Sequence, residues 1–182
     1  MSSTNEGGQV KNSKVKGNVD VKKYLNVIES SYVCGVASSS NEGANISNSY
    51  VGDDVSTKKY LDVNNSSVFG TASVKNEGMA LSSAKILADA KAIGFPTNKY
   101  VSIESNSTLC GTANSSYSYS GQLVGYCGLN DPSCRASQTL GTCPVDISEN
   151  SQYKDFYDYC GITPPKPEPT QCKLLSNGRL QR

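Results

Sequence analysis

The fold is decided by two stretches that begin and end alike, "KKYLNVIESSYVCGVASSSNEG" at Lys22–Gly43 and "KKYLDVNNSSVFGTASVKNEG" at Lys58–Gly78. A third stretch, "NKYVSIESNSTLCGTANSS" at residues 98–116, shares their start and lacks the closing Asn-Glu-Gly. The third position of each stretch is a tyrosine, namely Tyr24, Tyr60 and Tyr100. Such a regular recurrence is typical of duplicated supersecondary units that bury their apolar faces against one another.

Each copy has the local pattern of short strands. Runs such as "YLDV" and "YVSIES" are rich in valine and tyrosine and are separated by turn residues. The triplets Asn41–Gly43 and Asn76–Gly78 supply the asparagine and glycine that turns with positive φ prefer. We therefore predict an α+β protein that is mainly β, built from degenerate hairpin repeats of about 35 to 40 residues.

Two helices are predicted. Residues 80–93 are dense in alanine, place apolar residues at close to helical spacing, and precede Gly94 and Pro96, which are helix-stop signals. A shorter helix is predicted near residues 149–159, with Ser148 as a candidate N-cap and Gly161 as the C-terminal stop.

Four segments are expected along the chain, whose length of 182 residues suits one domain. Residues 1–19 are predicted to be a flexible N-terminal segment, and residues 20–116 a β-rich repeat domain that includes the helix near 80–93. Residues 117–161 are predicted to form a cysteine-rich region packed on that domain, and residues 162–182 a proline-rich extended tail.

Seven cysteines and the absence of histidine constrain the chemistry. No Cys-x-x-Cys pair occurs, so the usual zinc and thioredoxin-type spacings are missing. We therefore expect disulfides formed in an oxidising compartment, with reduced buried thiols in a cytosolic protein as the alternative. The candidates are Cys34, Cys110, Cys127, Cys134, Cys143, Cys160 and Cys172.

One position before a glycine is shared by the three copies: it holds Cys34 in "SSYVCG", Phe69 in "SSVFG" and Cys110 in "STLCG". The repeat predicts that this position faces inward on equivalent strands. In the second copy, the bulky ring of Phe69 would occupy this position. In the other two copies, Cys34 and Cys110 would form a disulfide there, either with each other or with cysteines of the cysteine-rich end.

Localisation is expected to be extracellular or at the cell surface. The first 17 residues have no apolar signal-peptide core, and no run of 18 apolar residues exists, so no membrane span is predicted. A removed signal or anchor, another export route, and incorporation into a virion or other assembly all remain open.

No catalytic, cofactor or metal site is predicted. The lack of histidine excludes Ser-His-Asp and Cys-His mechanisms. Ser82 and Lys85 match the Ser-x-x-Lys spacing, but the same spacing recurs elsewhere in this serine-rich chain, at Ser13, Ser56 and Ser151. A net charge of +1 argues against a nucleic-acid partner.

The candidate binding surface is the stretch "ANSSYSYSGQLVGY", with Tyr117, Tyr119 and Tyr126. Tyrosine supplies amphipathic contact area, and serine and asparagine supply adaptable hydrogen bonds, a composition typical of binding loops. A surface of this composition would suit contact with a glycan or a protein. The alternative interpretation is that the stretch is an ordinary outward-facing strand.

A local resemblance adds to this interpretation. "GANISNSYVGDDV" at Gly43–Val55 resembles the glycine-rich secreted bacterial repeat called GLUG, with Gly52 one position early. The resemblance covers about a dozen residues, and we do not assign the chain to that family. It implies a β-solenoid-like surface protein.

The sequence thus predicts a non-enzymatic extracellular or surface-exposed structural or adhesive protein. It would be a subunit of a larger assembly such as a fibre, pilus or virion, or would bind a glycan or a protein. A small secreted enzyme with Ser-Lys chemistry and a secreted disulfide-rich effector or inhibitor are the alternatives.

Overall fold

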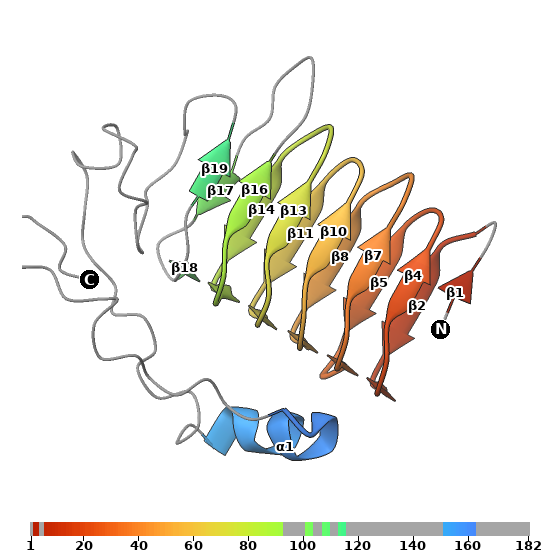
Figure 1. The fold of residues 1–182 in the computed structure, drawn as a ribbon, viewed down its shortest axis with the longest axis vertical. Helices are drawn as coiled ribbons and strands as arrows, with labels where there is room; N and C mark the ends of the chain where they lie inside the picture. Colours follow the sequence, from red (N-terminus) through yellow and green to blue (C-terminus); the bar gives the residue numbers. More distant parts are fainter. Residues whose placement is uncertain are drawn as a thin grey trace, which may run out of the picture.

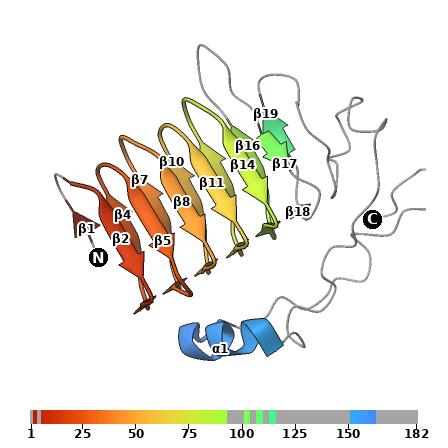
Figure 2. The ribbon, with the colours of Figure 1, turned by 180° about the vertical axis from the view of Figure 1, so that it is seen from behind.

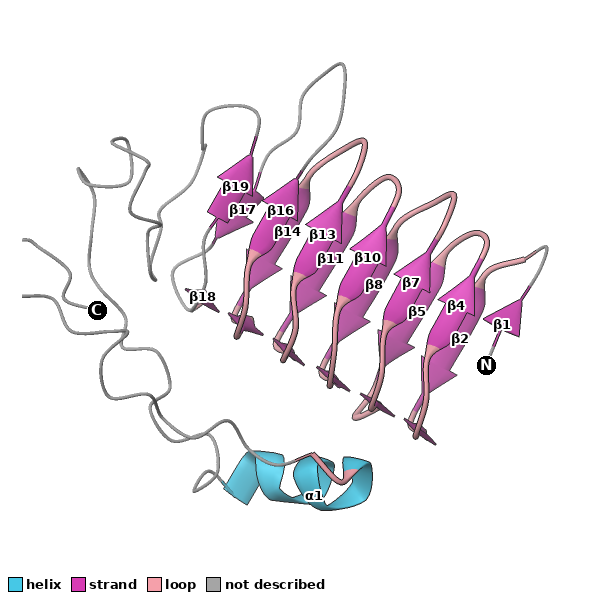
Figure 3. Cartoon of the chain, viewed as in Figure 1, coloured by secondary structure: helices cyan, strands magenta, loops and turns pink. Residues whose placement is uncertain are grey.

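The chain winds into a β-solenoid of stacked coils (Figure 1). A computed structural model describes residues 2–3, 6–92, 101–103, 107–109, 113–115 and 151–162. Three parallel sheets run along the stack, because each coil contributes one short strand to each sheet in turn. The coloured part of Figure 3 shows these strands, their turns and one helix beside them.

The sheets are named A, B and C. Sheet A contains β1 (Ser2–Ser3), β4 (Val19–Val21), β7 (Ala37–Ser39), β10 (Val55–Thr57), β13 (Ala72–Val74), β16 (Ala90–Ala92) and β19 (Ala113–Ser115). Sheet B contains β2 (Gly8–Lys11), β5 (Leu25–Ile28), β8 (Ala44–Ser47), β11 (Leu61–Asn64), β14 (Met79–Ser82) and β17 (Val101–Ile103). Sheet C contains β3 (Lys14–Val15), β6 (Tyr32–Val33), β9 (Tyr50–Val51), β12 (Ser67–Val68), β15 (Lys85–Ile86) and β18 (Thr108–Leu109).

The predicted hairpins are wrong, since all the strand pairs described are parallel. Leu25 pairs with Ala44 of the next coil, and Ala44 pairs in turn with Leu61 of the coil after that. Leu25 and Leu61 are equivalent positions of the sequence repeat, so one sequence repeat corresponds to two coils. Short strands separated by turns look the same locally in a hairpin and in a coil, and here the other two sides of each coil provide the connection that parallel pairing needs.

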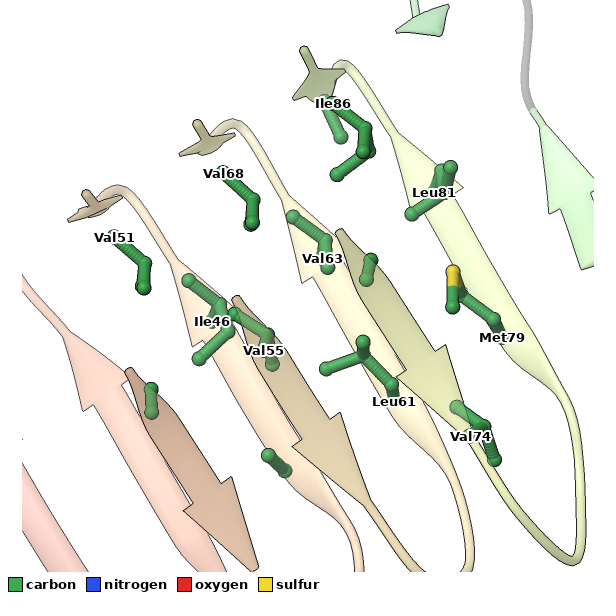
Figure 4. Close-up of a cluster of buried hydrophobic side chains, with 14 of the residues drawn as sticks. Ile46, Val51, Val55, Leu61, Val63, Val68, Val74, Met79, Leu81 and Ile86 are labelled. Carbon is green, nitrogen blue, oxygen red and sulfur yellow. The ribbon is translucent and has the colours of Figure 1, made fainter. Parts of the chain in front are cut away.

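The hydrophobic core runs inside the stack. In β11, Leu61 and Val63 are buried whereas Asp62 and Asn64 are exposed, as expected for side chains that alternate between the two faces of a strand. Figure 4 shows inward-pointing side chains from successive coils meeting in one continuous cluster. Each coil buries its apolar side chains against those of its neighbours, as repeat folds do.

The turn between sheets B and C is made by an Asn-Ser pair in two adjacent coils. Asn48 and Asn65 adopt left-handed φ angles of 49° and 45°, which asparagine tolerates better than most residues do. The serine after each is buried, and the Ser49 backbone N–H donates to Ser66 Oγ at 3.0 Å. Ser66 Oγ in turn donates to the carbonyl oxygen of Asn64 at 2.7 Å. Serine side chains thus satisfy backbone groups buried between coils.

The predicted helix over residues 80–93 is wrong as well. Residues 79–92 form β14, β15 and β16 of one more coil. Leu81, Ile86 and Ala90 occupy inward positions of three different strands. Their separations in sequence are close to helical spacing, but packing on the preceding coil overrides the helix propensity of the alanines.

Regular structure is present at both ends of the described chain. The N-terminal segment that was expected to be flexible contains β2, β3 and the start of β4, which belong to the first coils. The helix predicted near 149–159 is confirmed as α1 (Ser151–Cys160), and Gly161 ends it with a φ of 65°. Most of the cysteine-rich region and nearly all of the proline-rich tail lie outside the described residues.

Candidate functional site

Tyrosine and glycine alternate along the column of residues just before the strands of sheet B. From coil to coil, the column reads Gly7, Tyr24, Gly43, Tyr60 and Gly78. A Cβ atom added to Gly43 would lie 2.7 Å from the ring atoms of Tyr60. The rings of Tyr24 and Tyr60 come from coils two apart, yet their centroids are 6.0 Å apart with an interplanar angle of 44°. Two tyrosines therefore form a pair across a coil that carries no side chain at this position.

Charge alternates in the same turn. Lys-Lys-Tyr and Asn-Glu-Gly are two versions of one turn, so a lysine of one coil faces a glutamate of the preceding coil. Lys59 Nζ lies 2.6 Å from Glu42 Oε2, and Lys23 Nζ lies 3.6 Å from Glu6 Oε2. Both pairs are exposed to solvent, so they contribute little to stability. Large tyrosine side chains alternate with glycines from coil to coil, and basic lysines alternate with acidic glutamates. This alternation explains why the sequence repeats every two coils.

The tyrosine pair borders a column of amides and one carboxylate. Asn26, Asn45 and Asp62 are register partners in adjacent coils, and each lies two residues after the tyrosine–glycine column, so both columns face outward. We call Tyr24, Asn26, Asn45, Tyr60 and Asp62 the sheet B face. Parallel pairing sets neighbouring strands about 4.8 Å apart, so this face presents polar groups at a regular interval.

The surroundings of Tyr60 on the sheet B face keep its phenol protonated. Burial raises the pKa of Tyr60 to about 12, with further contributions from its hydrogen bond with Tyr24 and from the charges of Asp62 and Glu42. Partial burial also raises the pKa of the Asp62 carboxyl. The face therefore offers neutral hydroxyl and amide groups, an aromatic surface and a single carboxylate. Such groups suit a neutral, hydroxyl-rich ligand or a peptide backbone.

The outer face of sheet C carries a second group of aromatic residues, which α1 covers. Phe156 of α1 is fully buried, stacks on Phe69 at 5.0 Å with an interplanar angle of 15°, and meets Tyr32 edge-on at 5.4 Å. Polar contacts add to this packing, since the hydroxyls of Ser67 and Tyr153 lie 3.1 Å apart. Figures 1 and 2 show α1 beside the narrow edge of the stack where the short strands of sheet C lie. We call Tyr32, Tyr50, Phe69, Tyr153, Phe156 and Tyr157 the aromatic cluster.

Cys34 is bonded to Cys160 at the end of α1, 126 residues away, with their Cα atoms 5.2 Å apart. Of the two alternatives left open for Cys34, the bond to the cysteine-rich end is therefore the one formed, and a bond to Cys110 is excluded. The predicted inward orientation is wrong. Val33 points into the core, so Cys34, the next residue, faces outward toward α1, and Phe69 does the same one residue after Val68.

The disulfide matters because α1 is short. Isolated helices of fewer than about 12 residues are marginal in water. Burial of Tyr153, Phe156 and Tyr157 stabilises α1, while the loss of backbone freedom in its ten residues opposes its ordering. A bridge that closes a loop of more than about 100 residues adds on the order of 4 to 5 kcal/mol in the chain-entropy account.

The other predicted site residues are not brought together into a site. Ser82 ends β14 and Lys85 begins β15, across a turn in which Ser83 has a φ of 48°. They are therefore not one helical turn apart, and Lys85 Nζ lies 5.2 Å from the ring centroid of Tyr153. Outside the described residues lie Tyr117, Tyr119 and Tyr126, together with Cys110, Cys127, Cys134, Cys143 and Cys172.

Two kinds of feature are missing from the described residues. No group of three or more acidic or cysteine side chains could hold a metal ion there. None of the helical segments in this part of the chain is long and apolar enough to cross a membrane.

Sequence reasoning missed the sheet B face. Tyr24 and Tyr60 were noted as markers of the repeat, but their role as a surface pair was not anticipated. The signal was present, because Asn-Glu-Gly in one half of each repeat and Lys-Lys-Tyr in the other are the same length and precede similar strands.

Comparison with protein-family models, with curated protein sequences and with solved structures finds no significant match. The local resemblance of Gly43–Val55 to the GLUG repeat therefore does not extend to a family assignment. What the described structure defines is the class: a β-solenoid with a disulfide-linked helix on one side.

Proposed function

We propose that the protein is a non-enzymatic, surface-exposed structural or adhesive protein that binds an extended glycan chain along its solenoid. The sheet B face is the observation that carries this proposal. It places a tyrosine pair beside a column of amides at a spacing that repeats from coil to coil. Extended polymers with repeating hydroxyl groups match a ligand-binding surface of this kind.

Extracellular or cell-surface localisation is part of the proposal. The Cys34–Cys160 bond supports it, because disulfides persist in oxidising compartments and are rare in the cytosol. The same bond weighs against an effector or inhibitor confined to the cysteine-rich end, since α1 is packed on the solenoid and linked to it. Assembly into a fibre, pilus or virion is compatible with a stack of coils whose sheet A and sheet B faces are polar.

The proposal predicts that replacing the tyrosine pair abolishes most binding. With Tyr24→Ala and Tyr60→Ala together, affinity for any glycan that the wild-type protein retains on a glycan array should fall at least tenfold. The reason is that truncation of an aromatic contact residue commonly costs about 2 kcal/mol or more. The matched control is Ser38→Ala with Ser56→Ala, which alters the outer face of sheet A in register partners of adjacent coils. The control should bind like the wild-type protein.

Two results would contradict the proposal. Equal loss in the tyrosine and serine variants would show that the sheet B face is not the contact surface. Failure of the wild-type protein to bind any glycan on the array would show that its ligand is not a glycan. Analytical ultracentrifugation would then test the alternative, which is self-assembly through protein contacts.

A further inference from the structure

The outer face of sheet C is unlike the other outer faces of the solenoid. Sheets A and B present mainly serine, asparagine and charged side chains outward, whereas sheet C presents Tyr32, Tyr50 and Phe69. These rings contact Tyr153, Phe156 and Tyr157 of α1. A continuous aromatic patch of this kind is uncommon on a monomer surface unless it serves an interaction.

We propose that α1 is a cover locked by the Cys34–Cys160 disulfide, and that reduction of this bond releases α1 and exposes the aromatic face of sheet C. The proposal does not depend on a glycan ligand. It assigns to the bond a regulatory role in addition to stabilisation.

The solenoid is built to stay folded when α1 leaves. Its core forms one cluster that contains no residue of α1, and the side chains of α1 belong to a second cluster on the outside of sheet C. Tyr32 and Tyr50 also lie in strands whose backbones are paired to coils on both sides. Local opening of α1 therefore breaks the contacts of the outer cluster and leaves the core intact.

The state in which α1 covers sheet C depends on the disulfide, because the helix is too short to be stable alone. Cys34 and Cys160 are both partly exposed, so an external thiolate can reach the bond. A dithiol reductant would attack one sulfur, form a mixed disulfide and then close on itself. Two electrons pass to the Cys34–Cys160 bond, which becomes two thiols, while the reductant becomes a disulfide.

The test is hydrogen exchange of the full-length chain, read by mass spectrometry before and after treatment with dithiothreitol. Exchange in residues 151–162 should accelerate at least tenfold after reduction, while the strands of sheet B keep their protection. Trypsin cleavage after Lys154, whose side chain is 69% exposed within α1, should accelerate in the same way.

A double variant isolates this bond from the other five cysteines. Cys34→Ser with Cys160→Ser should show the fast exchange of α1 without reductant and should not respond further to dithiothreitol. Unchanged exchange of α1 in the reduced wild-type protein would overturn the proposal, since the aromatic contacts alone would then hold the helix. Loss of protection in sheet B on reduction would also overturn it, because the opening would be global. The wild-type comparison decides the question even if the double variant does not fold.

Discussion

Leu61→Ala is expected to lower the free energy of unfolding by about 2 to 5 kcal/mol, the usual cost of truncating a buried leucine. Leu61 is fully buried in the central coil, between Ala44 of the preceding coil and Met79 of the following one. Since Ala44 is already small, the cavity cannot be filled from that side. Urea denaturation monitored by circular dichroism measures the loss.

Asn64→Ala is the matched control, because Asn64 lies in the same strand and is exposed on the outer face. Its effect should stay within about 0.5 kcal/mol, as is usual for surface positions. Similar destabilisation by the two substitutions would contradict the inward and outward assignment of β11, and with it the register of sheet B.

Gly70→Ala is expected to cost about 1 to 3 kcal/mol through overpacking between coils. An added Cβ would lie 2.6 Å from the carbonyl carbon of Asp53 and from the backbone nitrogen of Asp54 in the preceding coil. Backbone atoms cannot move aside as the end of a flexible side chain can. The two coils would have to separate, which weakens the hydrogen bonds that join them.

Gly17→Ala provides a closely matched comparison. Gly17 holds the same position in the first coil, and a Cβ added there meets nothing within 4 Å. This variant should be as stable as the wild-type protein in thermal unfolding. If Gly17→Ala and Gly70→Ala lower the stability by the same amount, the loss would reflect a change in chain entropy and not a steric contact between coils.

Much of the architecture could be predicted from the sequence, at the level of local pattern. The strand and turn composition, the repeat and the short helix ending at Gly161 were all predicted. The direction of pairing was not, because alternation along a strand shows which residues share a face and says nothing about the neighbouring strand. The true period was hidden by the alternation of Lys-Lys-Tyr with Asn-Glu-Gly, which makes every second coil look alike.

Two predictions from the sequence were wrong, namely the helix over residues 80–93 and the inward orientation of Cys34, and their causes are related. A helix and a coil of short strands can place apolar residues at similar separations, and only contact with the preceding coil distinguishes them, as at Leu81 and Ile86. The orientation of Cys34 follows from that of Val33, which points into the core. The disulfide partner in turn required the position of α1, since several cysteines were available and sequence spacing does not determine connectivity.

The central claim is that equivalent residues of successive coils are stacked in parallel register. Spin labels attached by a non-thiol chemistry along the outer column of sheet A test it most directly by electron paramagnetic resonance. Asp20, Ser38, Ser56, Ser73 and Lys91 are successive partners in this column.

Label pairs at Ser38 and Ser73, at Ser38 and Lys91, and at Asp20 and Lys91 span two, three and four coils. The account predicts distances that rise in even steps, at about 10, 14 and 19 Å, because each coil advances the stack by about 4.8 Å. Distances that do not increase in this order, or a Ser38–Lys91 pair closer than the Ser38–Ser73 pair, would contradict the solenoid.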